Sequence, residues 1–256
     1  MTKISVVLNT FNEAKFLDRC LKNLKSLDEI VIIDMYSKDK TVEIAKKYTA
    51  NIYFHPRTIS VLYARNFSLT KATGDWILIV DPDEVFSLQL IEKLKEISKD
   101  NNFDAVEIPF RLYFLNKPLR YAYPIQYKIR FFKKNKAFFP ARVHSNPKIF
   151  GKVYQLPKEE IYIVQHRQDC SLKILIDKLS RYTTDEAKHR YFSDKEKCFF
   201  LDLIRKSLGD FFYRFFLNKG YKDGFRGFLF SLYMAIYYFV LYFKLWLYTI
   251  KNRCLI

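Results

Sequence analysis

The stretch Trp76-Ile-Leu-Ile-Val-Asp-Pro-Asp-Glu84 decides how this chain is interpreted. Its five apolar residues, most of them branched, predict a strand that is buried on both faces, as in a parallel sheet. Three carboxylates follow at the end of that strand, where α/β proteins usually bind ligands. Asp81 and Asp83 are spaced to hold a hard divalent cation. The alternative is a helix N-terminus, because Asp, Pro and Glu all suit a first helical turn.

The composition describes a folded, strongly basic protein. The chain has 256 residues, of which 50% are hydrophobic, and a formal net charge of +17. Its length allows one large domain, or one domain with an appendage. Nucleic acid, an anionic membrane surface and phosphate-bearing substrates are the partners that such a charge favours. No CxxC pair occurs among Cys20, Cys170, Cys198 and Cys254, which indicates reduced thiols without structural zinc. The first core strand begins at Ile4, so we expect no signal peptide before it.

The first hundred residues alternate between strand and helix patterns. Strands are expected at Ile4–Leu8, Glu29–Ile33, Asn51–Phe54 and Trp76–Val80, and helices at Ala14–Leu27, Lys40–Tyr48 and Val61–Ala72. This repetition predicts a parallel sheet with right-handed crossovers. No GxGxxG motif follows the first strand, which argues against a dinucleotide-binding Rossmann site.

The turns after the first, second and fourth strands should open on one edge of that sheet. They would bring together Thr10, Asn12, Glu13, Asp34, Asp81 and Asp83, with Arg65 nearby. These residues suit a nucleoside diphosphate. A carboxylate can accept hydrogen bonds from a base or a ribose, and a metal ion together with an arginine can neutralise the diphosphate. A simpler interpretation stays open for some of these residues, since Asn12, Ser37 or Asp39 could each cap a helix.

Four motifs give the chain a resemblance to a known family. They are Thr10–Glu13, Val31–Thr41, Ala64–Asn66 and Gly74–Asp83, and their order and spacing resemble those of the family 2 glycosyltransferases, which have the GT-A fold. The resemblance implies that Asp34 contacts the base, Asp81 the ribose or a metal, Asp83 the metal, and Arg65 the diphosphate. It also implies Mg²⁺ or Mn²⁺ as cofactor. Where many relatives have S-T-D-G-T, this chain has Ser37-Lys-Asp-Lys-Thr41, a loop that we expect to be stiffer without its glycine.

The middle of the chain resembles a narrower group, the WaaE-like β-glucosyltransferases of lipopolysaccharide-core synthesis. The residues that carry this resemblance are Tyr123–Lys134, Ala141–His144, and His166 before a helix at Ser171–Tyr182. The helix would bury Leu172, Leu175, Ile176 and Leu179. On this resemblance Arg130 faces the donor phosphates, His144 is catalytic and His166 is a metal ligand. The alternative for both histidines is a buried, hydrogen-bonded position that orders a loop.

One departure from that group concerns the catalytic base. The group has His-Glu where this chain has His144-Ser145, so the base is unassigned. Inverting transfer needs a carboxylate to take the proton of the acceptor hydroxyl, and Glu159, Glu160 and Asp169 are the candidates. Two alternatives remain: a polyprenyl phosphate acceptor, which is already ionised and needs no base, or an altered enzyme.

The last third of the sequence is unusually aromatic. Phe228–Phe243 is an uncharged run, which Lys244 interrupts before Leu245–Tyr248. Its length and its tyrosines favour an in-plane or re-entrant membrane helix with basic flanks. The alternatives are a helical pair that packs on the catalytic domain or on a second subunit, and a single membrane span. We interpret Gly220–Gly227 as a turn between helices.

The sequence as a whole predicts an α/β protein of GT-A type with a mainly parallel sheet and an aromatic helical C-terminal region. We expect a nucleotide-sugar-binding half at 1–110, an acceptor half at 111–170, and a membrane-associated or oligomerising region at 171–256. The predicted activity is inverting, metal-dependent transfer of a hexose from a UDP-sugar to a lipid-linked or saccharide acceptor, at the cytoplasmic face of the membrane. A non-catalytic basic membrane-binding protein is the alternative. No nucleic-acid-binding motif is present.

Overall fold

The structure, a computed structural model, describes residues 2–57, 61–100, 102–139, 147–168 and 170–251. The chain forms two compact units. The first comprises residues 1–111 and 126–167, and the second comprises 112–125 and 168–256. The predicted partition at 110 and 170 into donor and acceptor halves stays a prediction.

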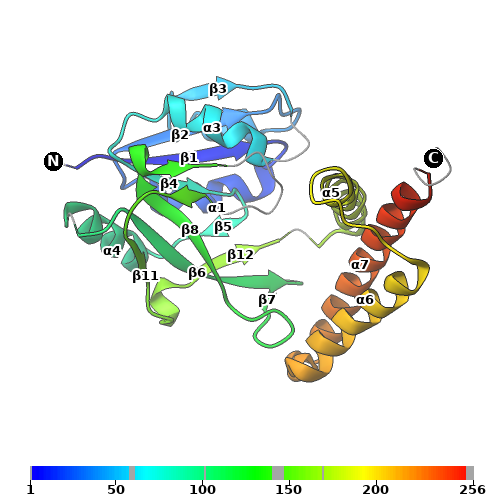
Figure 1. Ribbon diagram of the computed structural model, residues 1–256. Helices are drawn as coiled ribbons and strands as arrows, with labels where there is room; N and C mark the ends of the chain where they lie inside the picture. Colours follow the sequence, from blue (N-terminus) through cyan, green and yellow to red (C-terminus); the bar gives the residue numbers. More distant parts are fainter. Residues whose placement is uncertain (1, 58–60, 101, 140–146, 169, 252–256) are drawn as a thin grey trace. The chain divides into compact units, whose positions relative to one another are not determined.

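The first unit is built on a mixed sheet (Figure 1). Its parallel part has the order β3-β2-β1-β4, with β1 at Ile4–Thr10, β2 at Glu29–Asp34, β3 at Ile52–Phe54 and β4 at Trp76–Val80. Beyond β4 lie β8 (Gln126–Lys133), which is antiparallel to it, then β6 (Ala105–Phe114), β12 (Val164–Arg167) and β5 (Glu84–Val85). Smaller pieces are β11 (Val153–Gln155) on β6, and a separate pair of β9 (Ala137–Phe138) and β10 (Lys148–Ile149). The end of β6, from Leu112, and the short strand β7 (Lys117–Pro118) that pairs with it belong to the second unit. The sequence prediction of the four parallel strands is confirmed.

Two hydrophobic cores cover the two faces of the parallel strands. Alternate residues point to opposite faces of a strand, so Trp76, Leu78 and Val80 join one core while Ile77 and Ile79 join the other. The first core is completed by helices α1 (Ala14–Leu24), α2 (Thr41–Ala45) and α4 (Leu88–Lys99), and the second by α3 (Val61–Lys71). Burial on both faces explains why β4 is a continuous apolar run.

The acidic turn after β4 does not begin a helix, so that alternative interpretation is wrong. The chain enters the short strand β5 instead, and α4 starts at Leu88. Ser87 caps α4, since its hydroxyl accepts a hydrogen bond from the amide of Leu90 at 3.0 Å. The carboxylates at positions 81, 83 and 84 are therefore not needed to stabilise a helix terminus.

Gly74 lies where the chain approaches the start of β1, and it yields a stability prediction. A Cβ at this position would lie 2.6 Å from Ser5 Oγ and 2.8 Å from the carbonyl oxygen of Lys3. Gly74→Ala should therefore lower the free energy of unfolding by about 1–3 kcal/mol, because backbone must move. Gly209 is the matched control: nothing lies within 4 Å of its added Cβ, so Gly209→Ala should raise stability by about 0.5–1 kcal/mol. Urea unfolding measures both, and equal effects would contradict this account.

The second unit is mainly helical. It contains α5 (Leu172–Phe192), α6 (Phe200–Phe212), a π-helical turn η3 (Tyr213–Leu217), a 3₁₀ turn η4 (Gly220–Asp223) and α7 (Phe225–Lys251). The predicted turn at Gly220–Gly227 is confirmed, with η4 between the helices. Asp223 explains part of that motif, because its carboxylate accepts the backbone amides of Arg120, Tyr121 and Ala122 at 2.9–3.2 Å.

The predicted apolar face of α5 is wrong in its first half. Leu172 and Ile176 are 73% and 55% exposed, and the buried residues of α5 are Thr183 and Ala187. The reason is tertiary: α5 is anchored by its second half, where Lys244 of α7 hydrogen-bonds to Ser180, Thr183 and Thr184.

Candidate active site

The predicted site residues of the first two turns lie at one edge of the sheet, as expected. Thr10 and Asp34 end β1 and β2 and are partners in the strand register. The hydroxyl of Thr10 donates to Asp34 Oδ2 at 2.9 Å, and the amide of Ser37 donates to Asp34 Oδ1 at 2.8 Å. Asp34 is fully buried, so these bonds hold its carboxylate in a fixed orientation. Its contact with a base stays a prediction.

Asn12 and Asp39 tie the two turns together. Asn12 does not cap α1, because the N-cap residue is Glu13, whose side chain makes no capping hydrogen bond. Asn12 Oδ1 instead accepts a hydrogen bond from the amide of Lys38 at 2.7 Å. The backbone of Asn12 has a φ of 55°. Asp39 accepts the amides of Ala14 and Thr41, the first residues of α1 and α2. Asp39 therefore serves both helix starts. These hydrogen bonds join the turn after β1 to the turn after β2.

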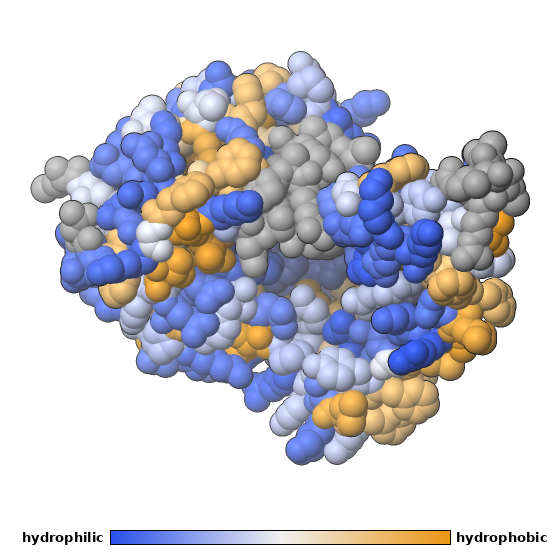
Figure 2. Space-filling model, in the orientation of Figure 1, coloured by the Kyte–Doolittle hydropathy of each residue, from blue (hydrophilic) through white to orange (hydrophobic). Residues whose placement is uncertain are grey.

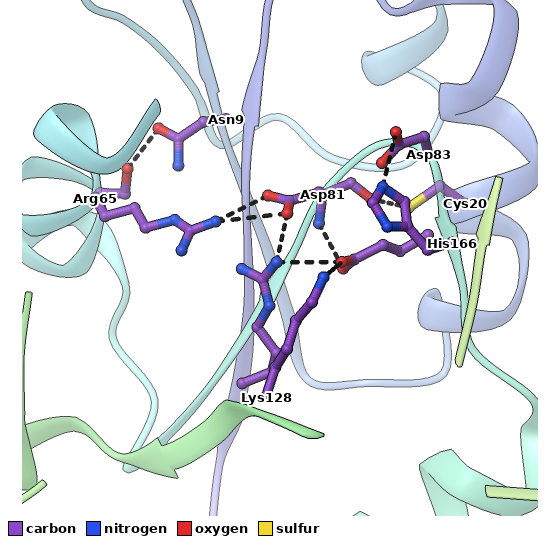
Figure 3. Close-up of polar contacts among 10 residues, drawn as sticks. Asn9, Cys20, Arg65, Asp81, Asp83, Lys128 and His166 are labelled. Carbon is purple, nitrogen blue, oxygen red and sulfur yellow. Dashed lines mark hydrogen bonds and ion pairs between the residues drawn. The ribbon is translucent and has the colours of Figure 1, made fainter. Parts of the chain in front are cut away.

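A cluster of charges surrounds the turn after β4 (Figure 3). Asp81 accepts hydrogen bonds from two arginines: Arg65 Nη2 lies 3.0 Å from its Oδ1, and Arg130 Nη2 lies 2.5 Å from its Oδ2. Burial alone would raise the pKa of Asp81, but Arg130 and Arg65 outweigh it and hold that pKa well below its usual range. Burial, together with Arg130, lowers the pKa of Arg65 to about 10. The cluster thus holds a buried cation that its acidic neighbours only partly compensate.

Glu84 is the residue that organises this cluster, and the sequence analysis gave it no role. It is 0% exposed, and it accepts the amide of Asp81 at 3.0 Å and Arg130 Nη2 at 3.1 Å. The ammonium of Lys128 lies 3.6 Å from its Oε1. Lys128 and Arg130 are two residues apart on β8 and so point to one face of it. That spacing from Arg130, which was itself predicted as a site residue, was the sequence signal that could have identified Lys128.

Asp83 and His166 form the second half of the site. His166 Nε2 lies 3.2 Å from Asp83 Oδ2, and the amide of Arg167 donates to the carbonyl oxygen of Asp83 at 2.7 Å. The pairing of β5 with β12 brings these residues together across 83 positions of the chain. Both side chains are partly exposed, so they remain accessible to a ligand.

These two side chains fit a divalent cation that is shared with a ligand. A carboxylate oxygen and an imidazole nitrogen are donors that Mn²⁺ accepts, while Mg²⁺ prefers oxygen. In the part of the chain that the structure describes, no group of three or more acidic, histidine or cysteine side chains could hold a metal. A cation here would therefore need further oxygens from its ligand and from water. Asp81, which was also predicted as a metal ligand, has both oxygens bonded to arginines in this structure.

The remaining predicted residues are distributed as follows. His144, Ser145 and Asp169 lie outside the described residues. Glu159 precedes a 3₁₀ turn, η2 (Glu160–Tyr162), and Glu160 pairs with Arg111 at 2.5 Å with its side chain 70% exposed. The catalytic base therefore stays unassigned.

The fold places the chain in a recognisable class, the α/β proteins of GT-A type. Residues 5–152 match the model of Glycosyl transferase family 2, and the chain belongs to this family. An uncharacterized glycosyltransferase of Rickettsia felis is 30% identical over 251 residues, which cover 92% of this chain and 86% of that protein. A second, from Rickettsia typhi, is 27% identical over 99% of this chain and 90% of its own length.

Two solved structures share the fold over nearly the whole chain. The mannosyltransferase PcManGT of Pyrobaculum calidifontis, in complex with GDP-Man and Mn²⁺, has a TM-score of 0.56 and 12% identity, covering 95% of this chain and 87% of that one. S. aureus TarS in complex with UDP has a TM-score of 0.51 and 15% identity, covering 98% and 91%. The predicted GT-A fold with its helical C-terminal region is thereby confirmed, and the protein is a glycosyltransferase.

Proposed function

We propose that this glycosyltransferase moves a hexose, with inversion, from a nucleoside-diphosphate sugar to a lipid-linked saccharide in cell-envelope glycan synthesis. The observation that carries the proposal is the pair of half-satisfied arginines that bond to Asp81. Arg65 Nε and Arg130 Nε and Nη1 are buried and have no hydrogen-bond partner among the described residues. Unpaired buried N–H groups are costly, and the oxygens of a diphosphate would satisfy them.

The chain's own residues then divide the work. Arg65 and Arg130 would hold the diphosphate, with Glu84 and Asp81 fixing their planes, and Lys128 would add positive charge beside it. Asp83 and His166 would hold Mg²⁺ or Mn²⁺, which supplies charge neutralisation for the departing diphosphate. The base and the ribose would bind against the turns after β1 and β2, which carry Thr10, Asn12, Glu13 and Asp34. Under this proposal, residues 1–110 bind the nucleotide-sugar donor and residues 111–170 form the acceptor half.

The donor and the place of action are parts of the same proposal. We expect a UDP-sugar; the fold neighbours include one protein bound to UDP and another bound to GDP-Man. The WaaE-like resemblance, the basic chain and its apolar C-terminal helix support a peripheral location on the cytoplasmic membrane face. A polyprenyl phosphate acceptor is the second candidate, because the chain has Ser145 where the narrower group has its glutamate.

A transfer assay tests this proposal. The full-length protein is incubated with labelled UDP-glucose, UDP-N-acetylglucosamine or GDP-mannose and a bacterial lipid extract, with Mn²⁺ or with EDTA. We expect label from one donor in the lipid fraction, and none with EDTA. Purified polyprenyl phosphate in place of the extract separates the two acceptors. If no sugar is transferred and no donor is hydrolysed with any of these nucleotide sugars, the proposal is contradicted. That result would favour a non-catalytic membrane-binding protein.

A further inference from the structure

Helix α7 carries an exposed apolar stripe along its whole length. The stripe recurs at spacings of three, four and four residues, and its members are each 37–72% exposed: Phe225, Phe228, Leu232, Ile236, Phe239, Phe243, Leu247 and Ile250. Eleven residues make three helical turns, so the stripe runs almost parallel to the axis. With 27 residues the helix is about 40 Å long. No charged residue interrupts the stripe.

Helix α6 extends this surface sideways. It runs antiparallel to α7, because the ring of Phe200 contacts Trp246 (5.7 Å between centroids) and the ring of Phe211 contacts Phe228 (6.0 Å). The large apolar residues of α6 and η3 that are 44–75% exposed are Phe200, Leu201, Ile204, Leu208, Phe212, Tyr213, Phe216 and Leu217. These ring contacts pack α6 against α7, and we call the two exposed sets together the α6/α7 apolar face. Figure 2 shows apolar residues gathered over α6 and α7.

The opposite flank of α7 is polar and occupied. The ammonium of Lys244 hydrogen-bonds to Ser180, Thr183 and Thr184 of α5 at 2.7–2.9 Å. Tyr237 donates to Glu186, which also pairs with Arg190 at 2.5 Å. Helix α7 is long and apolar enough to cross a membrane by composition. A spanning α7 would, however, draw these ionised α5 residues into hydrocarbon, which is costly.

Positive charges border the face. Arg205 and Lys206 on α6, and Lys219 and Lys222 beside the turn, are exposed and form no ion pair with a described residue. The acidic side chains of the same segment are engaged within the unit: Asp202 accepts the amide of Phe199, Asp210 pairs with Arg214, and Asp223 accepts backbone amides. The rim of the face therefore has a net positive potential, which complements an anionic surface.

We infer that the α6/α7 apolar face docks on an anionic lipid bilayer, with both helices lying in the plane of the membrane and not across it. The one-sided distribution of apolar groups with a cationic rim is the pattern of an interfacial helix. A second copy of this chain is the competing occupant, but two copies that each carry +17 repel one another. The inference extends the proposed function by specifying how the enzyme reaches a lipid-borne acceptor. It does not depend on transfer activity.

Vesicle flotation of the full-length protein tests this inference. We compare phosphatidylcholine vesicles with and without 30% phosphatidylglycerol (about one anionic lipid in three). The wild type should bind the anionic vesicles and lose part of that binding at high salt. Leu232→Glu with Phe239→Glu should reduce the partition coefficient at least ~10-fold. Phe225→Glu, at a position that is 72% exposed, is a second variant with less effect on packing.

Leu88→Glu is the matched control, because it places the same charge at an apolar position that is 56% exposed in the first turn of α4. It should bind vesicles like the wild type. Calorimetric nucleotide binding without vesicles should be unchanged in every variant, so a failure of docking is distinguishable from a failure of the proposed activity. Brominated lipids measure depth: Trp246 should be quenched more by bromine near the headgroups than by bromine near the chain ends.

Four results would overturn the inference. The first is that the wild type does not bind anionic vesicles, and the second is that Leu232→Glu with Phe239→Glu binds them as the wild type does. The third is that the bound protein resists alkaline carbonate extraction. The fourth is that the wild type forms a stable dimer in vesicle-free buffer, which this variant converts to a monomer. The third result would indicate a membrane span. The last would assign the face to a second copy of the chain.

Discussion

Replacing Glu84 with leucine should lower the free energy of unfolding by about 3–5 kcal/mol, because it removes one partner from a buried charge network. Glu84 is fully buried and joins the amide of Asp81 to Arg130 and Lys128. Without it, Arg130 keeps only Asp81 as a bonded counter-charge, Lys128 loses the carboxylate that lies 3.6 Å away, and the amide of Asp81 loses its acceptor. Urea unfolding at neutral pH, followed by circular dichroism, measures the effect.

Two further variants make this prediction specific. Glu84→Gln keeps an acceptor for the amide but removes the charge, so it should destabilise the protein less than leucine does. Glu92→Ala removes an exposed carboxylate of α4 that pairs with Lys95, and it should change stability by less than about 1 kcal/mol. If Glu84→Leu is as stable as Glu92→Ala, the central position that we give to Glu84 is wrong.

Asp83→Ala should lower the rate of sugar transfer at least ~100-fold, because a metal that neutralises the leaving diphosphate contributes several kcal/mol to the transition state. Asp83 is partly exposed and contacts His166, so we expect its removal to change stability by no more than about 1 kcal/mol. Transfer with saturating Mn²⁺, together with urea unfolding, separates the two effects.

The control for this prediction is Asp177→Ala in α5. This variant also deletes a carboxylate, in this case one that forms an i, i+4 ion pair with Arg181, but it leaves the proposed site intact and should transfer sugar at the wild-type rate. His166→Ala should resemble Asp83→Ala if both hold the metal. Wild-type transfer in both site variants would exclude them as metal ligands.

Local pattern was enough to predict the parallel half of the sheet. The run Trp76–Val80 has the same bounds in the sequence analysis and in the structure, because burial on both faces leaves an unbroken apolar signature. The edge on which Thr10 and Asp34 meet followed from the parallel direction of the strands. Asp83 and His166 were each predicted as metal ligands from family resemblance, whereas their contact depends on the pairing of β5 with β12.

What the sequence did not reveal depends on contacts between distant segments. The role of Glu84 requires β8, which carries Lys128 and Arg130 alongside β4. Asn12 is of a residue type that commonly caps helices, but its side chain accepts a hydrogen bond from the amide of Lys38 in another loop. Periodicity identified an apolar face on α5 but could not show that a lysine of α7 would bind the other half of that helix.

Calorimetric titration tests whether a metal-dependent nucleotide site lies at Asp83. UDP and GDP are each titrated into the wild type and into Asp83→Ala, with Mn²⁺ and with EDTA. The account predicts that one nucleotide binds the wild type in Mn²⁺, and that this binding is lost with EDTA and in the variant. Binding that is equally tight with EDTA and in Asp83→Ala, or no binding of either nucleotide, would contradict it.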